Sequence, residues 1–451
     1  MSGLEVIPKD VAFATAALTG FNRNRFLLET NGATSAGPSS IIQFTLPSNA
    51  TLDLKTLRIN LDLLTTSATP SGGTAIYGKL PADVSSLISS VEVYCGGVQI
   101  TQSCAEYNTV ARVLKIVRSS RDRDGSVDSL LAHSKISATD AVDDVSVVLS
   151  DFKSFLGESS TRYLPTNLTG DITIRLTMAP ASVLAYKVHN ADVGTSFADA
   201  AARTAAASIT YSASNIRASI DTISLGPAYE KMLFDRLSQE EFIACNYKEY
   251  YTFSLHGTTS AAHSLRFSLN ASSVDALYAV CRDGNYMTPG IKGHSYPGAT
   301  FTDAHCANAF FFKSFNDSNT KRGSLRYRFT AAQVSYPQFD ADILDAASDI
   351  SLVTNQVHTH DRGHMITGLN EFNNGKCIIP LVLNMPGQGI NVASGMNTKG
   401  SNTQFSFEVK GQTVPTANAA SQVTEQLSTL VICETTAQMR IMGAKSVAVS
   451  F

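Results

Sequence analysis

Apolar and polar residues alternate one by one in many short segments of this chain, and no other feature of the sequence limits the possible folds as strongly. The pattern is clearest in residues 57–63, 171–178, 325–329, 404–409 and 446–451. Successive side chains of a β-strand point to opposite faces, so strict alternation predicts antiparallel strands with one face in a core and the other in solvent. The chain is therefore predicted to be mainly β.

Turn residues separate these segments. A further strand is predicted at 41–46, before Pro47, and a hairpin at 91–100, where Gly96 and Gly97 supply the positive φ angles of a tight turn.

Three segments have apolar residues at helical spacing instead. Residues 105–117, 229–243 and 341–357 each fit an amphipathic helix packed on one face. Residues 190–208 are rich in alanine and hold little large apolar content, which favours a long exposed loop, with a surface helix as the alternative.

Composition narrows the class of protein. Of the 451 residues, 43% are hydrophobic, 16% are charged, and the formal net charge is −3. A disordered chain is excluded, and a surface that coats nucleic acid is disfavoured because phosphate binding needs clustered Lys and Arg. The polar residues are largely uncharged, which suits large protein–protein contacts.

The cysteines favour a protein of a reducing compartment. Their number is odd and no CxxC occurs, so neither a disulfide framework nor a zinc ribbon is indicated, and we expect scattered buried thiols. The seven positions are Cys95, Cys104, Cys245, Cys281, Cys306, Cys377 and Cys433. Residues 1–20 show no secretory signal, and no window approaches 18 consecutive apolar residues, so we expect neither secretion nor a membrane span.

The sequence also contains an apparent duplication. Residues 44–46 followed by 57–61 match residues 253–255 followed by 265–269, and the spacing of the two units agrees to within one residue. The predicted helix 229–243 lies at the join. The duplication predicts two β domains of about 200 residues each. This size fits an eight-stranded jelly roll once loops are added.

Few residues are candidates for binding a metal ion. His358 and His360, with His364 nearby, could place two imidazoles on one face of a strand as a metal pair, but an exposed polar loop is the favoured interpretation. Residues 121–128 faintly resemble a calcium loop without its distal glutamate, and a solvated turn is favoured.

Catalytic and phosphate-binding motifs are not recognisable. His305 directly precedes Cys306 rather than facing it as a base, and residues 387–389 lack the third glycine and the following helix of a phosphate cradle. We therefore expect no enzyme, and no catalytic residue, cofactor or metal ligand is assigned.

One modest basic cluster remains. Its residues are Arg112, Lys115, Arg118, Arg121 and Arg123. A nucleic-acid contact is one interpretation, but interface salt bridges or plain solvation are favoured, and no sequence-specific nucleic-acid binding is expected.

Several segments, in order along the chain, resemble the double-jelly-roll major capsid proteins of tailless icosahedral DNA viruses, the hexon-like lineage. Residues 87–100 are similar to that family's I-E-x-x-x-G-G-x-x-I run before the first helix. The other similar segments are 155–157, 163–165, 168–174, 209–216, 220–223, 334–337, 394–397 and 401–402. The chain lacks tryptophan and the long insertions of larger members, which leaves the virus group open.

The resemblance implies two consecutive eight-stranded jelly rolls in one chain, with a few helical insertions. We expect an N-terminal arm at 1–30, a first jelly roll at 31–228, a linking helix at 229–244 and a second jelly roll at 245–451.

It also implies a structural function. Three copies would form a pseudo-hexameric homotrimeric capsomer, and many capsomers would tile the icosahedral shell of a virion assembled inside the host cell. Penton and minor capsid proteins are the further partners implied, with an inner membrane as a candidate partner of the N-terminal arm. The alternatives are a two-domain β-sandwich carbohydrate-binding or adhesin protein and, third, a cupin-like enzyme.

Overall fold

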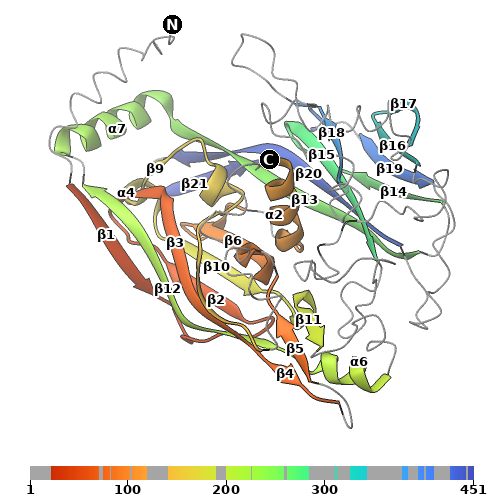
Figure 1. Cartoon of the computed structure of the whole chain (residues 1–451). Coiled ribbons are helices and arrows are strands. Elements are labelled where there is room, and N and C mark those ends of the chain that lie inside the picture. The colour runs from red at the N-terminus through yellow and green to blue at the C-terminus, as the bar shows by residue number, and fades with distance from the viewer. Residues whose placement is uncertain are drawn as a thin grey trace, which may run out of the picture.

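The computed structural model describes two β-sandwiches that lie side by side (Figure 1). The described residues are 22–70, 75–81, 83–101, 104–118, 141–188, 200–224, 226–258, 262–283, 310, 312, 326–342, 378–383, 395–400, 403–410, 427–442 and 445–451.

The first sandwich consists of two antiparallel sheets. Its long sheet has the order β1-β12-β3-β8, and its short sheet has the order β2-β10-β6-β7. The strands of the long sheet are β1 (Asn22–Glu29), β12 (Tyr211–Ser224), β3 (Thr51–Thr65) and β8 (Asp144–Leu149), and β9 (Tyr163–Pro165) pairs with β3. The strands of the short sheet are β2 (Ile41–Thr45), β10 (Ile172–Met178), β6 (Ile88–Cys95) and β7 (Val98–Gln99).

The second sandwich repeats this plan. Its long sheet has the order β13-β20-β15-β18, and its short sheet has the order β14-β19-β16-β17. The long sheet contains β13 (Phe242–Thr258), β20 (Leu427–Met442), β15 (Val274–Asp283) and β18 (Ile378–Val382), with β21 (Ser446–Ser450) paired to β20. The short sheet contains β14 (Ala262–Ser268), β19 (Gln404–Lys410), β16 (Arg326–Ala331) and β17 (Val334–Asp342).

The two sandwiches have the same topology. Strands that come at the same point in the sequence of each half occupy the same position in their sheets. β1, β12, β3 and β8 correspond to β13, β20, β15 and β18, and the short sheets correspond in the same way. Two four-stranded antiparallel sheets connected in this order form a jelly roll. The predicted fold, mainly β with two consecutive jelly rolls, is confirmed.

The repeat detected in the sequence nevertheless pairs the wrong strands. Residues 44–46 include the end of β2, whereas 253–255 belong to β13, and the counterpart of β2 is β14. The match between 57–61 in β3 and 265–269 in and after β14 is shifted in the same way. The duplication is real in topology, but alternation looks alike in every strand and cannot identify equivalent ones.

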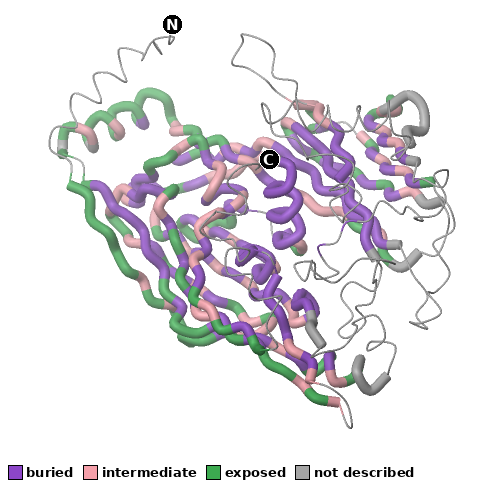
Figure 2. Tube along the Cα trace, viewed as in Figure 1, coloured by how far each residue is buried: buried purple, intermediate pink, exposed green. Residues whose placement is uncertain are grey.

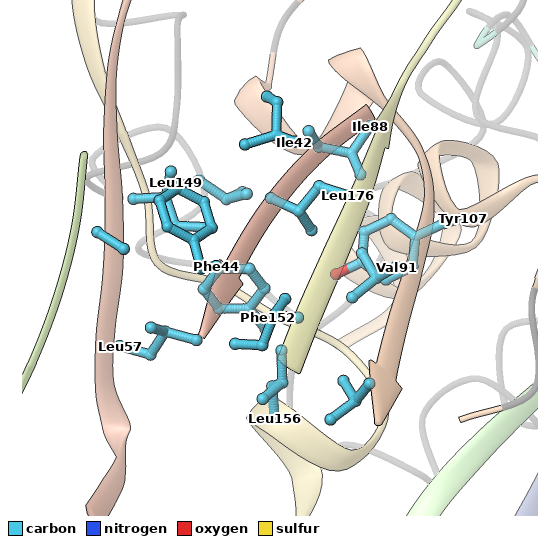
Figure 3. Packing of buried hydrophobic residues seen from close by; sticks show 14 of the residues in the cluster. Ile42, Phe44, Leu57, Ile88, Val91, Tyr107, Leu149, Phe152, Leu156 and Leu176 are labelled. Carbon is cyan, nitrogen blue, oxygen red and sulfur yellow. The ribbon is translucent and has the colours of Figure 1, made fainter. Parts of the chain in front are cut away.

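Alternation predicts the core correctly. In β10, Ile172, Ile174 and Leu176 are completely buried, and the residues between them are partly exposed. Figure 3 shows Phe44 from β2 and Leu176 from β10 among the packed side chains of this core.

Short elements close the ends of the first sandwich. A small sheet has the order β11-β5-β4. Its strands are β4 (Ser67–Ala68), β5 (Ile76–Lys79) and β11 (Ala185–Val188). The short helices are η1 (Val84–Leu87), α3 (Phe155–Glu158), α4 (Thr166–Thr169) and η3 (Ala181–Val183).

Two predicted helices are present with shifted ends. α2 spans Tyr107–Arg118, and α7 spans Pro227–Glu240 between the sandwiches. Pro227 suits the first helical position, where no backbone N–H is needed. The helix ends before the predicted residues 243–244 because Glu241 takes a left-handed backbone, with φ 63°, and β13 begins at Phe242.

Three other expectations change. α6 (Ala200–Ala207) occupies part of the predicted exposed loop 190–208, and Ala206 is completely buried in the core, so the helical alternative holds there. Of the helix predicted at 341–357, the first two residues belong to β17 and the others lie outside the described residues. Residues 22–29, placed in the N-terminal arm, form β1, which pairs with β12 along its whole length.

Candidate functional site at the junction of the two sandwiches

Among the described residues, buried apolar contacts and ion pairs are concentrated at the junction between the sandwiches. Helix α2 leaves the short sheet of the first sandwich after β7 and lies against the long sheet of the second (Figure 1). Figure 2 shows that the helix is buried along its described length. An amphipathic helix usually has one apolar face, but α2 makes apolar contacts on two sides. One side packs on the first sandwich and the other packs on the second.

One side of the helix packs on the second sandwich. Val110, Val113, Leu114 and Val117 are completely or almost completely buried in a cluster with residues of the long sheet. The residues that the second sandwich contributes to this cluster are Tyr250, Ala276, Tyr278, Val280, Phe312, Ile378, Leu430 and Ile432. A dry apolar contact of this kind excludes water and fixes the two sandwiches relative to one another.

The other side belongs to the first core. Tyr107 and Ala111 lie in the cluster between the two sheets of the first sandwich, where Figure 3 shows Tyr107 beside Val91. The Tyr107 hydroxyl accepts a hydrogen bond from the backbone N–H of Lys153 at 2.9 Å. Burial raises the pKa of this phenol far above its usual range, so it is a structural group.

A buried carboxylate holds α2 to the first sandwich. Asp83, just before η1, lies 2.6 Å from Arg112 Nη1 and 2.8 Å from Lys115 Nζ. Burial alone would raise the pKa of Asp83, but the two cations together lower it below its ordinary value. Two residues of the predicted basic cluster, Arg112 and Lys115, are therefore engaged in internal ion pairs and do not form a nucleic-acid surface. The side chains of Arg118, Arg121 and Arg123 lie outside the described part of the chain.

A second ion pair crosses the junction. Arg282 of β15 has a side chain only 1% exposed, and it pairs with Glu106 next to the start of α2. Its Nη1 also donates to Thr109 Oγ1 at 3.1 Å. A buried arginine needs such partners because an uncompensated charge is costly to remove from water.

Residues of β13 make further contacts between the two sandwiches. The Tyr247 hydroxyl donates to the carbonyl of Ile100 at 2.6 Å, and its ring meets Phe155 edge-on with centroids 5.4 Å apart. The Tyr250 hydroxyl donates to Glu158 Oε2 at 2.6 Å. Each contact joins one sandwich to the other.

A glycine turn completes the junction. Gly96, in the β6–β7 hairpin, has φ +55°, and a Cβ there would lie 2.9 Å from the Thr169 carbonyl oxygen and 3.3 Å from that of Lys445. The predicted hairpin is present, and its glycine is required by the turn and by the close approach of the Thr169 carbonyl, with the Lys445 carbonyl of the second sandwich as the next neighbour.

The chemistry suggested by the sequence is not assembled in the described parts of the chain. His358, His360 and His364 lie outside them, as do residues 121–128, His305 with Cys306, and residues 387–389. Within the residues that are described, no group of three or more His, Cys, Asp or Glu side chains could hold a metal ion, and no helix is long and apolar enough to cross a membrane.

The five described cysteines are buried free thiols, as predicted. Burial raises the pKa of Cys95 to about 11 and that of Cys281 to about 12, so neither forms an appreciable thiolate at neutral pH. They behave as small apolar side chains of the core.

Two charged residues of the junction, Asp83 and Arg282, were missed at the sequence level, whereas Arg112 and Lys115 were noted as part of a basic cluster. Asp83 and Arg282 stand in no recognisable motif, and their partners are distant in the chain. The only available signal was that both are charged residues beside apolar runs, in a chain with few charges.

The fold defined by these sheets is that of the double-jelly-roll viral capsid proteins. No family model matches the sequence, and no curated protein matches it.

Solved structures do match. VP54 of PBCV-1, in a structure fitted into a reconstruction of the virophage Sputnik, has a TM-score of 0.58 at 15% identity, over 96% of this chain and 97% of that one. A chain of the Sputnik virophage has a TM-score of 0.55 at 12% identity, over 96% and 89%. The major capsid protein of Faustovirus has a TM-score of 0.51 at 10% identity, over 94% and 91%. At these identities, the likeness establishes the shared fold.

Proposed function

We propose that this protein is the major capsid protein of an icosahedral virus and that three copies form a pseudo-hexameric capsomer. The proteins that share its fold over almost their whole length include a major capsid protein and a chain of a virophage particle. We infer a structural rather than an enzymatic role, exercised through contacts between copies.

The observation that carries the proposal is the unequal covering of two equivalent faces. The outer face of the long sheet in the second sandwich is covered by α2 of the first. The equivalent face of the first sandwich is open: Figure 2 shows exposed residues along β1 and β12, and every residue of β1 except Leu28 is exposed.

A head-to-tail contact between similar units can be repeated. The junction joins the short-sheet side of one sandwich to the long sheet of the next, so it is heterologous, and heterologous contacts form closed rings when the rotation closes. Three chains supply six similar sandwiches, which fits a ring of pseudo-sixfold outline. The open face around β1 is then the surface that receives the next copy.

The wider assembly follows from the same proposal. Capsomers would tile the shell of a virion assembled in the host cell, with penton and minor capsid proteins as further partners and an inner membrane as a candidate contact of the N-terminal residues.

The test is the oligomeric state of the purified protein. Multi-angle light scattering at micromolar concentration is expected to show trimers, and electron microscopy is expected to show triangular or hexagonal particles. A stable monomer at that concentration would contradict the proposal.

A single substitution makes the test specific to the open face. Leu27 in β1 is 71% exposed, so Leu27→Glu is expected to leave thermal unfolding of the subunit unchanged and to convert trimers to monomers, because a charge is placed in a contact that excludes water. The matched control is Ile41→Glu, at a residue that is 62% exposed on the short-sheet side, and this variant is expected to remain trimeric.

A further inference from the structure

Three arginines lie around two buried carboxylates on the outer face of the long sheet of the first sandwich. Arg23 and Arg25 belong to β1, Asp53 to β3 and Asp221 to β12, and Arg162 directly precedes β9. The side chains of the two aspartates are 0% and 6% exposed, whereas those of the three arginines are 45%, 61% and 52% exposed. The carboxylates therefore lie beneath the guanidinium groups, at the end of the sheet nearest α7 (Figure 1).

Shared carboxylates fix the guanidinium groups relative to one another. Arg162 donates to both oxygens of Asp53 at 3.0 Å, which makes a bidentate pair. Arg23 and Arg25 donate through Nε to the two oxygens of Asp221, each at 2.8 Å. The Nη2 atom of Arg23 lies 2.6 Å from Asp221 and 3.5 Å from Asp53, so this arginine joins the two halves of the cluster. Charge-assisted bonds of this kind hold a planar guanidinium group in a defined orientation.

The cluster keeps positive charge and hydrogen-bond donors at the surface. Two carboxylates balance two of the three guanidinium groups, so one positive charge remains. Lys55 lies near the cluster, and Glu158 beside it balances its charge. Arg25 uses only Nε, and Arg162 uses only Nε and Nη2, in hydrogen bonds with other described residues. The remaining terminal N–H groups of these two arginines are available to a ligand.

A further cation continues the cluster along the same face. Arg58 of β3 lies opposite Ser219, which is two residues before Asp221 in β12 and therefore on the same face of the sheet. Arg58 is exposed. Arg217, the next outward-facing residue of β12, lies opposite Glu29 of β1, which balances its charge. The excess positive charge is therefore confined to one end of the face.

These features favour a small phosphate-bearing ligand. The whole chain has a net charge of −3, and a long nucleic acid needs many separated cations, which this compact cluster does not supply. A phosphate group is small, carries more than one negative charge, and accepts paired N–H donors from fixed guanidinium groups better than from flexible lysines. A second or third phosphate on the same ligand would face Arg58.

We propose that this cluster is a binding site for the phosphate groups of a small polyphosphate. The three arginines contact the ligand, and the two buried aspartates position them. This inference does not rest on the proposed capsomer, because the ligand is neither a copy of this chain nor another protein.

Isothermal titration calorimetry of the full chain with sodium tripolyphosphate, at about 150 mM salt, tests the site. The expected result is saturable binding of one tripolyphosphate per chain. Arg25→Gln is expected to weaken this binding about tenfold, because a charge-assisted contact is lost. Asp221 keeps Arg23 as its partner in this variant, so an unchanged melting temperature is expected.

The matched control is Arg236→Gln in α7. Arg236 is also 61% exposed and also donates through Nε to one carboxylate, that of Glu240 at 2.9 Å, but it lies outside the cluster. This variant is expected to bind tripolyphosphate like wild type. An equal loss of affinity in Arg236→Gln and Arg25→Gln would show attraction by overall charge and would overturn the inference.

Arg25→Lys separates a fixed guanidinium site from simple charge attraction. Lysine keeps the charge but lacks the planar pair of donors, so affinity is expected to fall about as far as in Arg25→Gln. Binding as tight as that of wild type would contradict the proposed geometry.

The remaining outcomes distinguish this inference from the proposed function. Light scattering on the same sample gives the oligomeric state. Trimers that bind no tripolyphosphate would overturn the site and leave the capsid function standing, whereas a stable monomer that binds it would support the site and contradict the capsomer. Binding to phosphatidic acid vesicles or to single-stranded DNA, without binding of tripolyphosphate, would indicate a different class of ligand and would also overturn the inference.

Discussion

At the scale of single residues, the junction depends on a few buried charges. Asp83 is completely buried between Arg112 and Lys115, and Arg282 is almost completely buried beside Glu106. Removing one partner from such a group leaves an uncompensated charge inside the protein, which costs more than the pair contributes when intact. These residues therefore fix α2 in one position, because any other position would leave a buried charge without its partner.

Asp83→Asn is expected to destabilise the protein by about 3 to 5 kcal/mol at pH 7, because both cations lose their counter-charge. The pKa of Asp83 in the folded protein lies below its ordinary value of 3.8, so its contribution is complete above that value and is lost as the pH falls through the folded pKa. Urea unfolding at pH 7, 4 and 3 should show the difference between wild type and variant shrinking on acidification. A difference that persists unchanged at pH 3 would contradict this account.

The matched control for that experiment is Asp62→Asn. Asp62 is partly exposed, and hydrogen bonds from Ser146 and Asn215 lower the pKa of its carboxyl. Because water solvates this group, the variant is expected to unfold at nearly the same urea concentration as wild type.

Gly157 tests backbone packing at the start of the junction. A Cβ at this position would overlap the Phe152 carbonyl oxygen, so the backbone of α3 must shift to accept any side chain. Gly157→Ala is expected to cost about 3 kcal/mol, measured by thermal unfolding. Gly37→Ala is the control, because nothing lies within 4 Å of a Cβ there, and equal melting temperatures for the two variants would disprove the packing argument.

At the scale of elements, α2 belongs to both sandwiches. Leu114→Ala is expected to leave a cavity on the side of the second sandwich and to destabilise the protein by about 2 to 5 kcal/mol. Val142→Ala, at a residue that is 38% exposed, serves as the control and is expected to change stability by less than about 0.5 kcal/mol. Differential scanning calorimetry measures both changes in stability. An unaffected melting temperature for Leu114→Ala would contradict a stabilising contact between α2 and the second sandwich.

The elements also show what the sequence could predict. Period-two alternation identified β10 and the β6–β7 hairpin because one face of each is buried and a strand has only two faces. The same periodicity could not distinguish β13 from β14 as the counterpart of β2. α6 was missed because alanine-rich residues carry little amphipathic signal, although Ala206 is buried. The partners of Asp83 and Arg282 depend on tertiary contacts that no local pattern records.

At the scale of the whole molecule, the core of the first sandwich is completed by residues of the second, which also has a core of its own. Cys245 and Tyr247 of β13, with Met439 and Ile441 of β20, belong to the hydrophobic cluster of the first sandwich. Figure 1 shows these long strands passing from the second sandwich to the side of the first. The chain is therefore a pair of similar units in topology, and the core of the first unit includes side chains that the second unit supplies.

The last prediction follows from this shared core. A fragment of residues 1–226 lacks the side chains that β13 and β20 supply, so it is expected to expose apolar surface and to show no cooperative thermal transition. Co-expression with residues 227–451 is expected to restore a folded, co-purifying pair with near-ultraviolet circular dichroism like that of the intact chain. As a control, the same co-expression with Tyr247→Ala is expected to recover less complex, because the variant loses the hydrogen bond to Ile100 and the contact with Phe155. Cooperative unfolding of the first fragment alone, at the melting temperature of the intact chain, would show that the sandwiches are independent.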